Sequence, residues 1–388
     1  MTGGIYNTST NAIVNISGDG VYTDEQNNLS GVAISGGTFY YEITDAQCAE
    51  GYTVATNTDA EGNIISWTVT GAPALTGSIR LKSGALNLLD KVAIIYECVD
   101  DTIVTNEADV SERGILLFDS AEKAATKDPT QAYEIVTLEW SDAKQAYRGQ
   151  TEGIDARDMD KSQFAVAYLK MTDGTYIFGT YKGNDQVIEY SPLIYCKTKK
   201  DDPAVGNLCR AMMHYGAAAQ VAQYGKTSGL MNEGFAAIPY DERVLGESVF
   251  SVDTAMINGM QLKSAIMDLK GAVSYIVEFS IDEKLEGKQL YAEYSLLSKT
   301  GYVPLVLHTN GRLRAIIDGV PAKDLGATLK VKSYYMDDNG EKVYGGELVY
   351  SGYEYVRRAV VNTSYSETVK DLSKALAMYI YYADNYGN

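Results

Sequence analysis

The chain has 388 residues, of which 45% are hydrophobic, so it is long enough for two or three domains with substantial cores. Its net charge of −18 argues against nucleic acid and against an anionic membrane surface as partners, because both attract basic faces. The sequence has neither an apolar run long enough to span a membrane nor a signal peptide at its start, so we expect no membrane insertion in this fragment.

Residues 1–70 predict the end of a β-helix or β-solenoid followed by a hairpin. Short β-branched runs alternate here with Gly, Ser, Thr and Asn, and the phrase GGIY at residues 3–6 returns as GGTF at residues 36–39. Such near-regular spacing is typical of the rungs of a parallel β-helix. Because a whole phrase follows directly on Met1, we expect earlier rungs to have been removed and the chain to be the C-terminal fragment of a longer protein.

The acidic stretch that follows the rungs imitates the start of a calcium-binding loop. Asp59 and Glu61 occupy ligand positions, but position twelve is Thr68, where such a loop needs a bidentate Glu. Two runs of alternating residues, 52–56 and 63–69, flank the stretch. A hairpin is therefore the better prediction, and we expect no metal.

Residues 71–388 contain a divergent duplication. LKSGALNLLDKVAIIYECVD from Leu81 matches LKSAIMDLKGAVSYIVEFSID from Leu262, and GIDARDMD from Gly153 matches GVPAKDLG from Gly319. In each copy, runs of alternating apolar residues broken by Asp-Gly or Asn-Gly turns predict antiparallel strands. We therefore expect two tandem antiparallel β modules, 71–228 and 229–388.

Each predicted module ends in an α-helix. An apolar stripe with steps of three and four recurs in both, at Val205, Leu208, Met212, Tyr215 and Ala219 and at Val369, Leu372, Leu376, Tyr379 and Ala383. This spacing places the stripe on one face of a helix, and we expect that face to cover the module's own sheet. The sequence thus predicts a mainly β chain, with a short β-solenoid-like segment followed by two duplicated β modules, each closed by one helix.

The first of these helices is followed by Gly225-Lys226-Thr227, the last three letters of a phosphate-binding P-loop. A P-loop also needs a glycine five residues earlier, where this chain has Gln220, and a helix after the lysine instead of before it. We interpret Gly225 as the left-handed glycine that ends the helix, and Lys226 as a cation near the negative end of the helix dipole. No nucleotide binding is expected.

Several phrases of this sequence resemble those of large, multi-module surface and secreted proteins of gut Clostridia and Ruminococcus-like Firmicutes. The phrases are ISGGTF, CAEGY, SERGILLF, GIDARDMD and LCRAMMHYGAAAQ. The last is similar to a phrase that closes a β module in those proteins, beside β-helical, Ig-like or anchoring domains. The resemblance implies an extracellular or cell-surface location and transfers no catalytic residue. The chain has no sorting signal or dockerin, so we expect its signal peptide and anchor to lie outside this fragment.

No catalytic residue is predicted. The two histidines, His214 and His308, stand in no catalytic motif; His214 aligns with Met378 of the second helix, and His308 precedes a predicted Asn-Gly turn. The signatures of serine hydrolases, cysteine hydrolases and zinc proteases are absent from the sequence. Carboxylate pairs carry no information among 51 acidic residues, so we expect the chain not to be an enzyme.

The four cysteines, Cys48, Cys98, Cys196 and Cys209, lack the C-x-x-C spacing of zinc and redox sites. We expect them to be buried as small apolar residues. No cofactor-binding and no metal-ligating residue is predicted.

The most unusual feature of the composition is 31 tyrosines beside 7 phenylalanines and 2 tryptophans. Tyrosine suits binding surfaces, because its ring is apolar and its tip is polar. We expect a non-catalytic adhesion module that binds a host protein, for example an immunoglobulin, or a glycan. The candidate contact residues are Tyr353, Tyr355 and Arg357, which alternate onto one face of a predicted strand.

Three alternatives stay open. In the first, the same tyrosine face covers the core of the second module, with Arg357 at its edge. In the second, the chain is a structural stalk or spacer without a ligand. In the third, it is a fragment of a β-helical polysaccharide-processing enzyme whose groove lies in the missing rungs.

Overall fold

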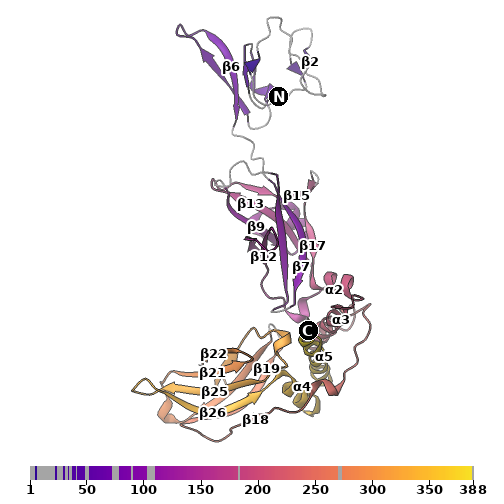
Figure 1. Cartoon of the computed structure of the whole chain (residues 1–388), viewed down its shortest axis with the longest axis vertical. Helices are drawn as coiled ribbons and strands as arrows, with labels where there is room; N and C mark the ends of the chain where they lie inside the picture. Colours follow the sequence, from indigo (N-terminus) through magenta and orange to yellow (C-terminus); the bar gives the residue numbers. More distant parts are fainter. Residues whose placement is uncertain are drawn as a thin grey trace. The chain divides into compact units, whose positions relative to one another are not determined.

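The computed structural model of the chain (Figure 1) describes residues 5–6, 22–23, 29–30, 34, 37–40, 42–48, 52–71, 78–88, 91–102, 110–181, 184–269 and 273–386. The chain divides into two compact units. The first contains Met1–Ser78, Asp100–Val110 and Met171–Ile177, and the second contains Ile79–Val99, Ser111–Lys170 and Phe178–Asn388. The described residues form several antiparallel sheets and five α-helices, and none of these sheets closes into a barrel. The predicted mainly β class is confirmed.

The first unit contains a four-stranded sheet of order β1-β4-β6-β5. Its strands are β1 (Ile5–Tyr6), β4 (Gly37–Phe39), β6 (Ile64–Gly71) and β5 (Tyr52–Thr58); η1 is Asp45–Gln47, and β2 (Tyr22–Thr23) pairs with β3 (Leu29–Ser30). β1 runs parallel to β4 with Ile5 opposite Thr38 and Tyr6 opposite Phe39, so these residues pair in the register of the sequence repeat. Most other residues of the predicted rungs lie outside the described residues.

β5 and β6 form the predicted hairpin. Asp59 Oδ1 accepts hydrogen bonds from the backbone N–H groups of Glu61 at 3.1 Å and Asn63 at 2.8 Å. The Asn63 side chain also donates to Asp59, and these bonds together lower the pKa of the Asp59 carboxyl. The acidic stretch therefore uses its carboxylate to close its own turn, and Thr68 pairs with Ala55 in the strand ladder.

The first half of the second unit has two main sheets. Their orders are β10-β9-β13-β14, with β17 also paired to β13, and β11-β12-β8-β7. The strands are β7 (Ser78–Asn87), β8 (Ala93–Thr102), β9 (Val110–Phe118), β10 (Glu134–Thr137), β11 (Glu139–Ser141), β12 (Ala146–Gln150), β13 (Gln163–Met171), β14 (Tyr176–Phe178), β15 (Thr180–Tyr181), β16 (Asn184–Asp185) and β17 (Ile188–Tyr190). Residues 115–118 of β9 and 165–169 of β13 are buried without a break, because these central strands are covered on both faces.

The second half of this unit also has two sheets, of order β18-β26-β25-β21-β22 and β19-β20-β24-β23. The strands are β18 (Ser251–Val252), β19 (Met260–Asp268), β20 (Ser274–Ile281), β21 (Leu290–Leu296), β22 (Lys299–Pro304), β23 (Val306–Leu307), β24 (Leu313–Ile317), β25 (Leu329–Met336) and β26 (Lys342–Tyr350). Met260 of one sheet and Leu290 of the other belong to one apolar cluster, so the inner faces pack against each other as in a β-sandwich.

Helices join and follow these sheets. They are α1 (Ala121–Thr126), α2 (Pro192–Lys199), α3 (Gly206–Ala219), α4 (Gly352–Val361) and α5 (Glu367–Asp384), with short 3-10 helices η3 (Pro129–Gln131), η4 (Ala156–Asp158), η6 (Glu242–Leu245), η7 (Glu283–Leu285) and η8 (Ala322–Asp324). α3 continues into a π-helical turn, η5 (Gln220–Tyr224), which ends at Gly225 with φ of +66°. The predicted left-handed helix end at this glycine is confirmed.

The prediction of one closing helix after each set of strands is wrong, because a pair of helices is present in each place. α2 precedes α3, and α4 precedes α5. Both extra helices begin after a serine, Ser191 or Ser351, whose hydroxyl accepts a hydrogen bond from the backbone N–H three residues later. The alternation of tyrosines after Ser351 predicts a strand, so the helix α4 corrects that prediction.

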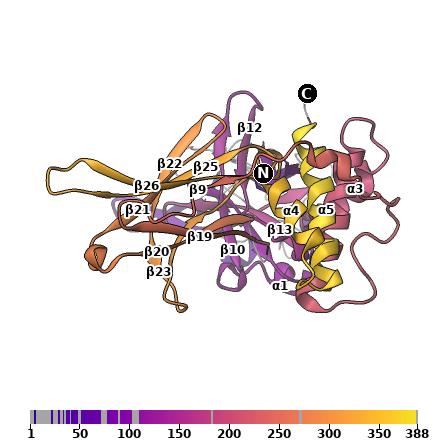
Figure 2. The same cartoon turned by 90° about the horizontal axis from the view of Figure 1, so that it is seen from below.

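The prediction that α3 and α5 cover their own sheets is also wrong. All residues of both apolar stripes are buried except the half-buried Val369, but the two helices pack against each other. The rings of Tyr215 and Tyr379 stack with centroids 5.5 Å apart. In both views, α3, α4 and α5 lie side by side at one end of β19–β26 and not over a sheet face (Figures 1 and 2).

Candidate functional site

The three predicted contact residues lie on a helix, so the prediction that they share one face of a strand is wrong. α4 begins after Ser351, whose hydroxyl accepts a hydrogen bond from the Glu354 backbone N–H at 3.2 Å. On a helix, residues four apart share a face, whereas residues two apart point in nearly opposite directions. Tyr353 and Arg357 therefore lie on one side of α4, and Tyr355 lies on the other.

Contacts within the chain engage all three side chains. Burial raises the pKa of Tyr355, which is hydrogen-bonded to Ser373. The Arg357 guanidinium donates to the backbone carbonyl of Gly246 at 2.9 Å. The half-buried Tyr353 ring packs so closely that a Cβ atom on Gly326 would come within 2.8 Å of it. α4 is thus a packing helix.

Tyrosines gather instead on the outer face of the sheet that contains β21 and β25. Four neighbouring strands contribute one ring each: Tyr302 of β22, Tyr291 of β21, Tyr334 of β25 and Tyr344 of β26. In this order the ring centroids are 5.8, 5.4 and 5.8 Å apart. We call these four residues the tyrosine row.

Strand register places the tyrosine row. Tyr291 lies directly opposite Tyr334, and Tyr334 lies opposite Tyr344, so these rings are cross-strand neighbours. Leu290 and Ala292 are buried, so the alternation of the strand directs Tyr291 to the outer face. Cross-strand aromatic pairs stabilise the sheet and restrict the rotamers of the rings.

Exposure increases along the row toward the edge of the sheet. Tyr334, in the middle, is 5% exposed, and burial raises its pKa. Tyr302, on the edge strand β22, is 66% exposed. The row therefore presents one accessible ring that rests against a fixed aromatic neighbour.

Charged groups border the row. Glu293 accepts hydrogen bonds from Lys342 Nζ and from the Tyr344 hydroxyl, each at 2.8 Å. The bond from Lys342 and the bond from Tyr344 lower the pKa of Glu293. The Lys342 ammonium also lies 4.5 Å from the centroid of the Tyr334 ring. Flat rings beside fixed donors and acceptors can stack on the apolar face of a ligand and hydrogen-bond to its polar edge.

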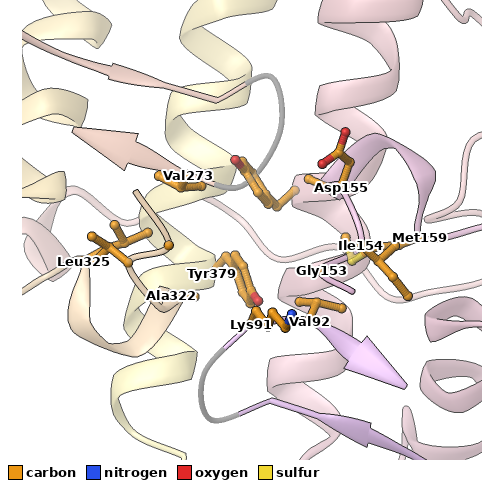
Figure 3. A pocket seen from close by; sticks show the side chains of 14 residues that line it. Lys91, Val92, Gly153, Ile154, Asp155, Met159, Val273, Ala322, Leu325 and Tyr379 are labelled. Carbon is orange, nitrogen blue, oxygen red and sulfur yellow. The ribbon is translucent and has the colours of Figure 1, made fainter. Parts of the chain in front are cut away.

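A cavity of about 90 Å³ lies elsewhere in the second unit, between residues 153–159 and residues 319–325 (Figure 3). Figure 3 shows Ile154 and Met159 on one side and Ala322 and Leu325 on the other. The stacked rings of Tyr215 and Tyr379 also line this cavity.

The two histidines make structural contacts. The His214 ring lies 2.9 Å from both the Ala236 carbonyl and the Asn232 side-chain nitrogen. The backbone of His308 pairs with Arg312 across the predicted turn. Among the residues that the structure describes, no group of three or more His, Cys, Asp or Glu side chains is placed to hold a metal ion. No helix in the same residues is long and apolar enough to cross a membrane.

The Gly-Lys-Thr phrase lies after a helix, as expected. Lys226 Nζ pairs with Asp160 Oδ2 at 3.2 Å, and Gln220 donates to the same carboxylate oxygen at 2.7 Å. The lysine therefore joins the end of the helix to the loop beside η4. The phosphate-cradling backbone of a P-loop is not formed at this place.

Sequence reasoning missed the tyrosine row, although part of its signal was present. Tyr291, Tyr302, Tyr334 and Tyr344 each stand in a run of alternating residues, which predicts a strand with a tyrosine on one face. The alternation did not show that these four strands are neighbours or that their tyrosines share a face. Register supplied both facts.

No protein-family model matches this sequence, and no curated protein does. Among solved structures, the chain is similar to a Ca²⁺-stabilised adhesin that helps an Antarctic bacterium reach out and bind ice. The two sequences are 11% identical, the match covers 76% of this chain and 54% of that chain, and the TM-score is 0.17. It is also similar to a tetra-tandem repeat in the extending region of a large adhesion protein, with 10% identity, 77% and 55% coverage, and a TM-score of 0.18. The chain spans about half the length of each. TM-scores this low do not indicate a shared fold.

Proposed function

We propose that this chain is a non-catalytic binding segment of an extracellular or cell-surface protein, and that it holds a glycan on the tyrosine row. The observation that carries the proposal is the exposed ring of Tyr302 beside rings that are fixed by cross-strand stacking. A sugar ring has an apolar C–H face and a polar rim. A tyrosine ring stacks on the first, and Glu293 and Lys342 are placed to hydrogen-bond to the second.

A glycan fits the row better than a host protein does. The cores of protein interfaces are depleted of charged residues, whereas this face carries alternating charges next to its rings. Glu293 lies opposite Lys332, and Lys332 lies opposite Glu347. Polar groups at this density suit a ligand with a hydroxyl on most of its carbons. A host protein such as an immunoglobulin is the second outcome of the screen described below.

We also propose that residues 71–228 and 229–388 are duplicated modules. The matching strand orders β11-β12-β8-β7 and β23-β24-β20-β19 support this proposal. A carboxylate and an arginine stand opposite each other at the same place in both sheets: Glu97 with Arg148 at 3.0 Å, and Glu278 with Arg314 at 2.8 Å. In both cases a serine of the neighbouring strand also donates to the carboxylate.

The proposed duplication also matches a buried tyrosine in each module, since Tyr168 corresponds to Tyr334. The Tyr168 hydroxyl donates to Glu112, and its ring lies directly against Gly114. Tyr168 is 1% exposed and Tyr334 is 5% exposed, so both are buried.

A glycan microarray with the full chain tests the proposed function. We expect the wild-type chain to bind a subset of glycans, and Tyr302→Ala to reduce that binding at least tenfold. Tyr133→Ala is the matched control, because Tyr133 is also on the surface, at 51% exposure, but stands outside the row. A chain that binds no glycan, but binds immunoglobulin in a parallel assay, would contradict the glycan proposal. A chain that binds neither would support the spacer alternative.

A further inference from the structure

One residue that lines the cavity between residues 153–159 and 319–325 carries a buried polar group without a partner. Tyr215 is 1% exposed, it lines the cavity, and its hydroxyl makes no hydrogen bond among the residues that the structure describes. Burial raises the pKa of Tyr215, so this hydroxyl stays neutral and able to donate. A buried donor without a partner is costly, and each such group in a folded protein calls for an explanation.

The walls of the cavity determine what it can accept. Most are apolar, with Ile154 and Met159 on one side and Leu325 on the other (Figure 3). The two charged residues at its rim already have partners: Lys91 pairs with Glu152 at 3.4 Å, and Asp155 pairs with Arg157 at 3.5 Å. A charged ligand would therefore find no unpaired counter-charge in these two residues. The lining favours a neutral molecule.

The volume of the cavity further limits the class of ligand that it can hold. An apolar cavity of roughly 150 Å³ holds one benzene ring, and this cavity measures about 90 Å³. Its occupant would thus be smaller than benzene, with an apolar body and one oxygen that can pair with the Tyr215 hydroxyl. Short aliphatic alcohols and carbonyl compounds have this composition.

We propose that this cavity is a binding site for a short-chain aliphatic alcohol or carbonyl compound, held by the apolar walls and by a hydrogen bond with the Tyr215 hydroxyl. The site is separate from the tyrosine row and does not depend on glycan binding. Its lining includes Tyr215 of α3 and Tyr379 of α5, so an occupant would contact residues from both proposed modules.

The experiment titrates the full chain with 1-propanol, which is smaller than benzene, followed by NMR with ¹³C-labelled tyrosine rings. We expect saturable shifts of the Tyr215 resonance in the wild-type chain. Tyr215→Phe keeps the ring and removes the hydroxyl, so it should weaken 1-propanol binding roughly five- to tenfold, as expected for the loss of one hydrogen bond. Tyr96→Phe, a buried tyrosine that does not line the cavity, should leave the affinity unchanged.

Propionate, which keeps the three-carbon chain of 1-propanol but carries a charge, should bind at least tenfold more weakly than 1-propanol. The proposal is overturned if 1-propanol produces no saturable shift, if Tyr215→Phe binds it as well as the wild type, or if propionate binds more tightly. A crystal soaked in 1-propanol that shows water alone on the Tyr215 hydroxyl would also overturn it, because water would then be the partner.

Discussion

Replacing Glu278 by Gln should destabilise the second unit substantially. The Glu278 side chain is 7% exposed. Its carboxylate accepts hydrogen bonds from Arg314, Arg312, Ser264 and Asn310. Burial alone would raise its pKa, but these four donors outweigh burial and hold the pKa at about 2. Glu278→Gln keeps the shape of the side chain and removes the charge that pairs with two arginines.

The size of the effect follows from the pKa. The pKa of Glu278 is about 2 in the folded chain, and its ordinary value is 4.5. At 1.36 kcal/mol for each pKa unit, this difference corresponds to about 3 kcal/mol of stability at neutral pH. A carboxyl whose pKa is lowered by folding contributes this stability above pH 4.5 and loses it as the pH falls toward 2. The free energy of unfolding of the wild-type chain should therefore fall over this pH window.

Hydrogen exchange of the amides in β20, measured by mass spectrometry, reports this free energy for the strand itself. At pH 7, Glu278→Gln should lower the free energy of unfolding by about 2 to 4 kcal/mol. The difference in this free energy between variant and wild type should shrink as the pH approaches 2. Glu347→Gln is the control, because Glu347 is 35% exposed as a side chain and pairs with Lys332 at 3.2 Å. We expect the control to change stability by less than about 1 kcal/mol. An effect of Glu278→Gln as small as the control's would refute the reasoning.

Three further results are expected. Leu372→Ala should lower the free energy of unfolding by about 2 to 5 kcal/mol in urea denaturation, because the Leu372 side chain is buried at 5% exposure. The control Val361→Ala, at a residue that is 75% exposed, should change this free energy by less than about 0.5 kcal/mol. Equal effects of the two substitutions would contradict the packing of α5. Gly225→Ala should lower the free energy of unfolding by about 1 to 2 kcal/mol, because alanine is strained at the Gly225 φ of +66°. An unchanged melting temperature would contradict the left-handed conformation at this helix end. ATP with Mg²⁺ should leave the melting temperature unchanged, whereas a ligand at 100 times its Kd adds about 2.7 kcal/mol; a rise abolished by Lys226→Ala would refute this.

The sequence predicted those features whose signals are local. Gly225 ends its helix because glycine adopts a left-handed backbone at little cost, and this requires no knowledge of the rest of the chain. The β5–β6 hairpin is likewise local, since Asp59 bonds the backbone of its own turn. Ser351 and Glu354 form the Ser-x-x-Glu pattern of a helix start, and that signal was available but was overridden by the alternation of tyrosines.

Features that depend on distant contacts were not predictable in this way. The spacing of the apolar stripes shows that α3 and α5 each bury one face, but it does not show that Tyr215 and Tyr379 meet. The tyrosine row depends on register, and the pairing of β25 with β26 shifts between Lys332 and Tyr334. This irregularity brings Tyr334 opposite Tyr344, and no periodicity in either strand predicts the irregularity.

We propose that the ligand contacts lie on the tyrosine row and not on α4. The most direct measurement is an NMR titration of the ¹³C-tyrosine-labelled chain with the tightest-binding glycan from the array. We expect the resonances of Tyr302 and Tyr291 to shift first and to saturate together, while those of Tyr353 and Tyr355 stay in place. Shifts confined to Tyr353 and Tyr355, or saturable binding without any shift in the tyrosine row, would contradict it.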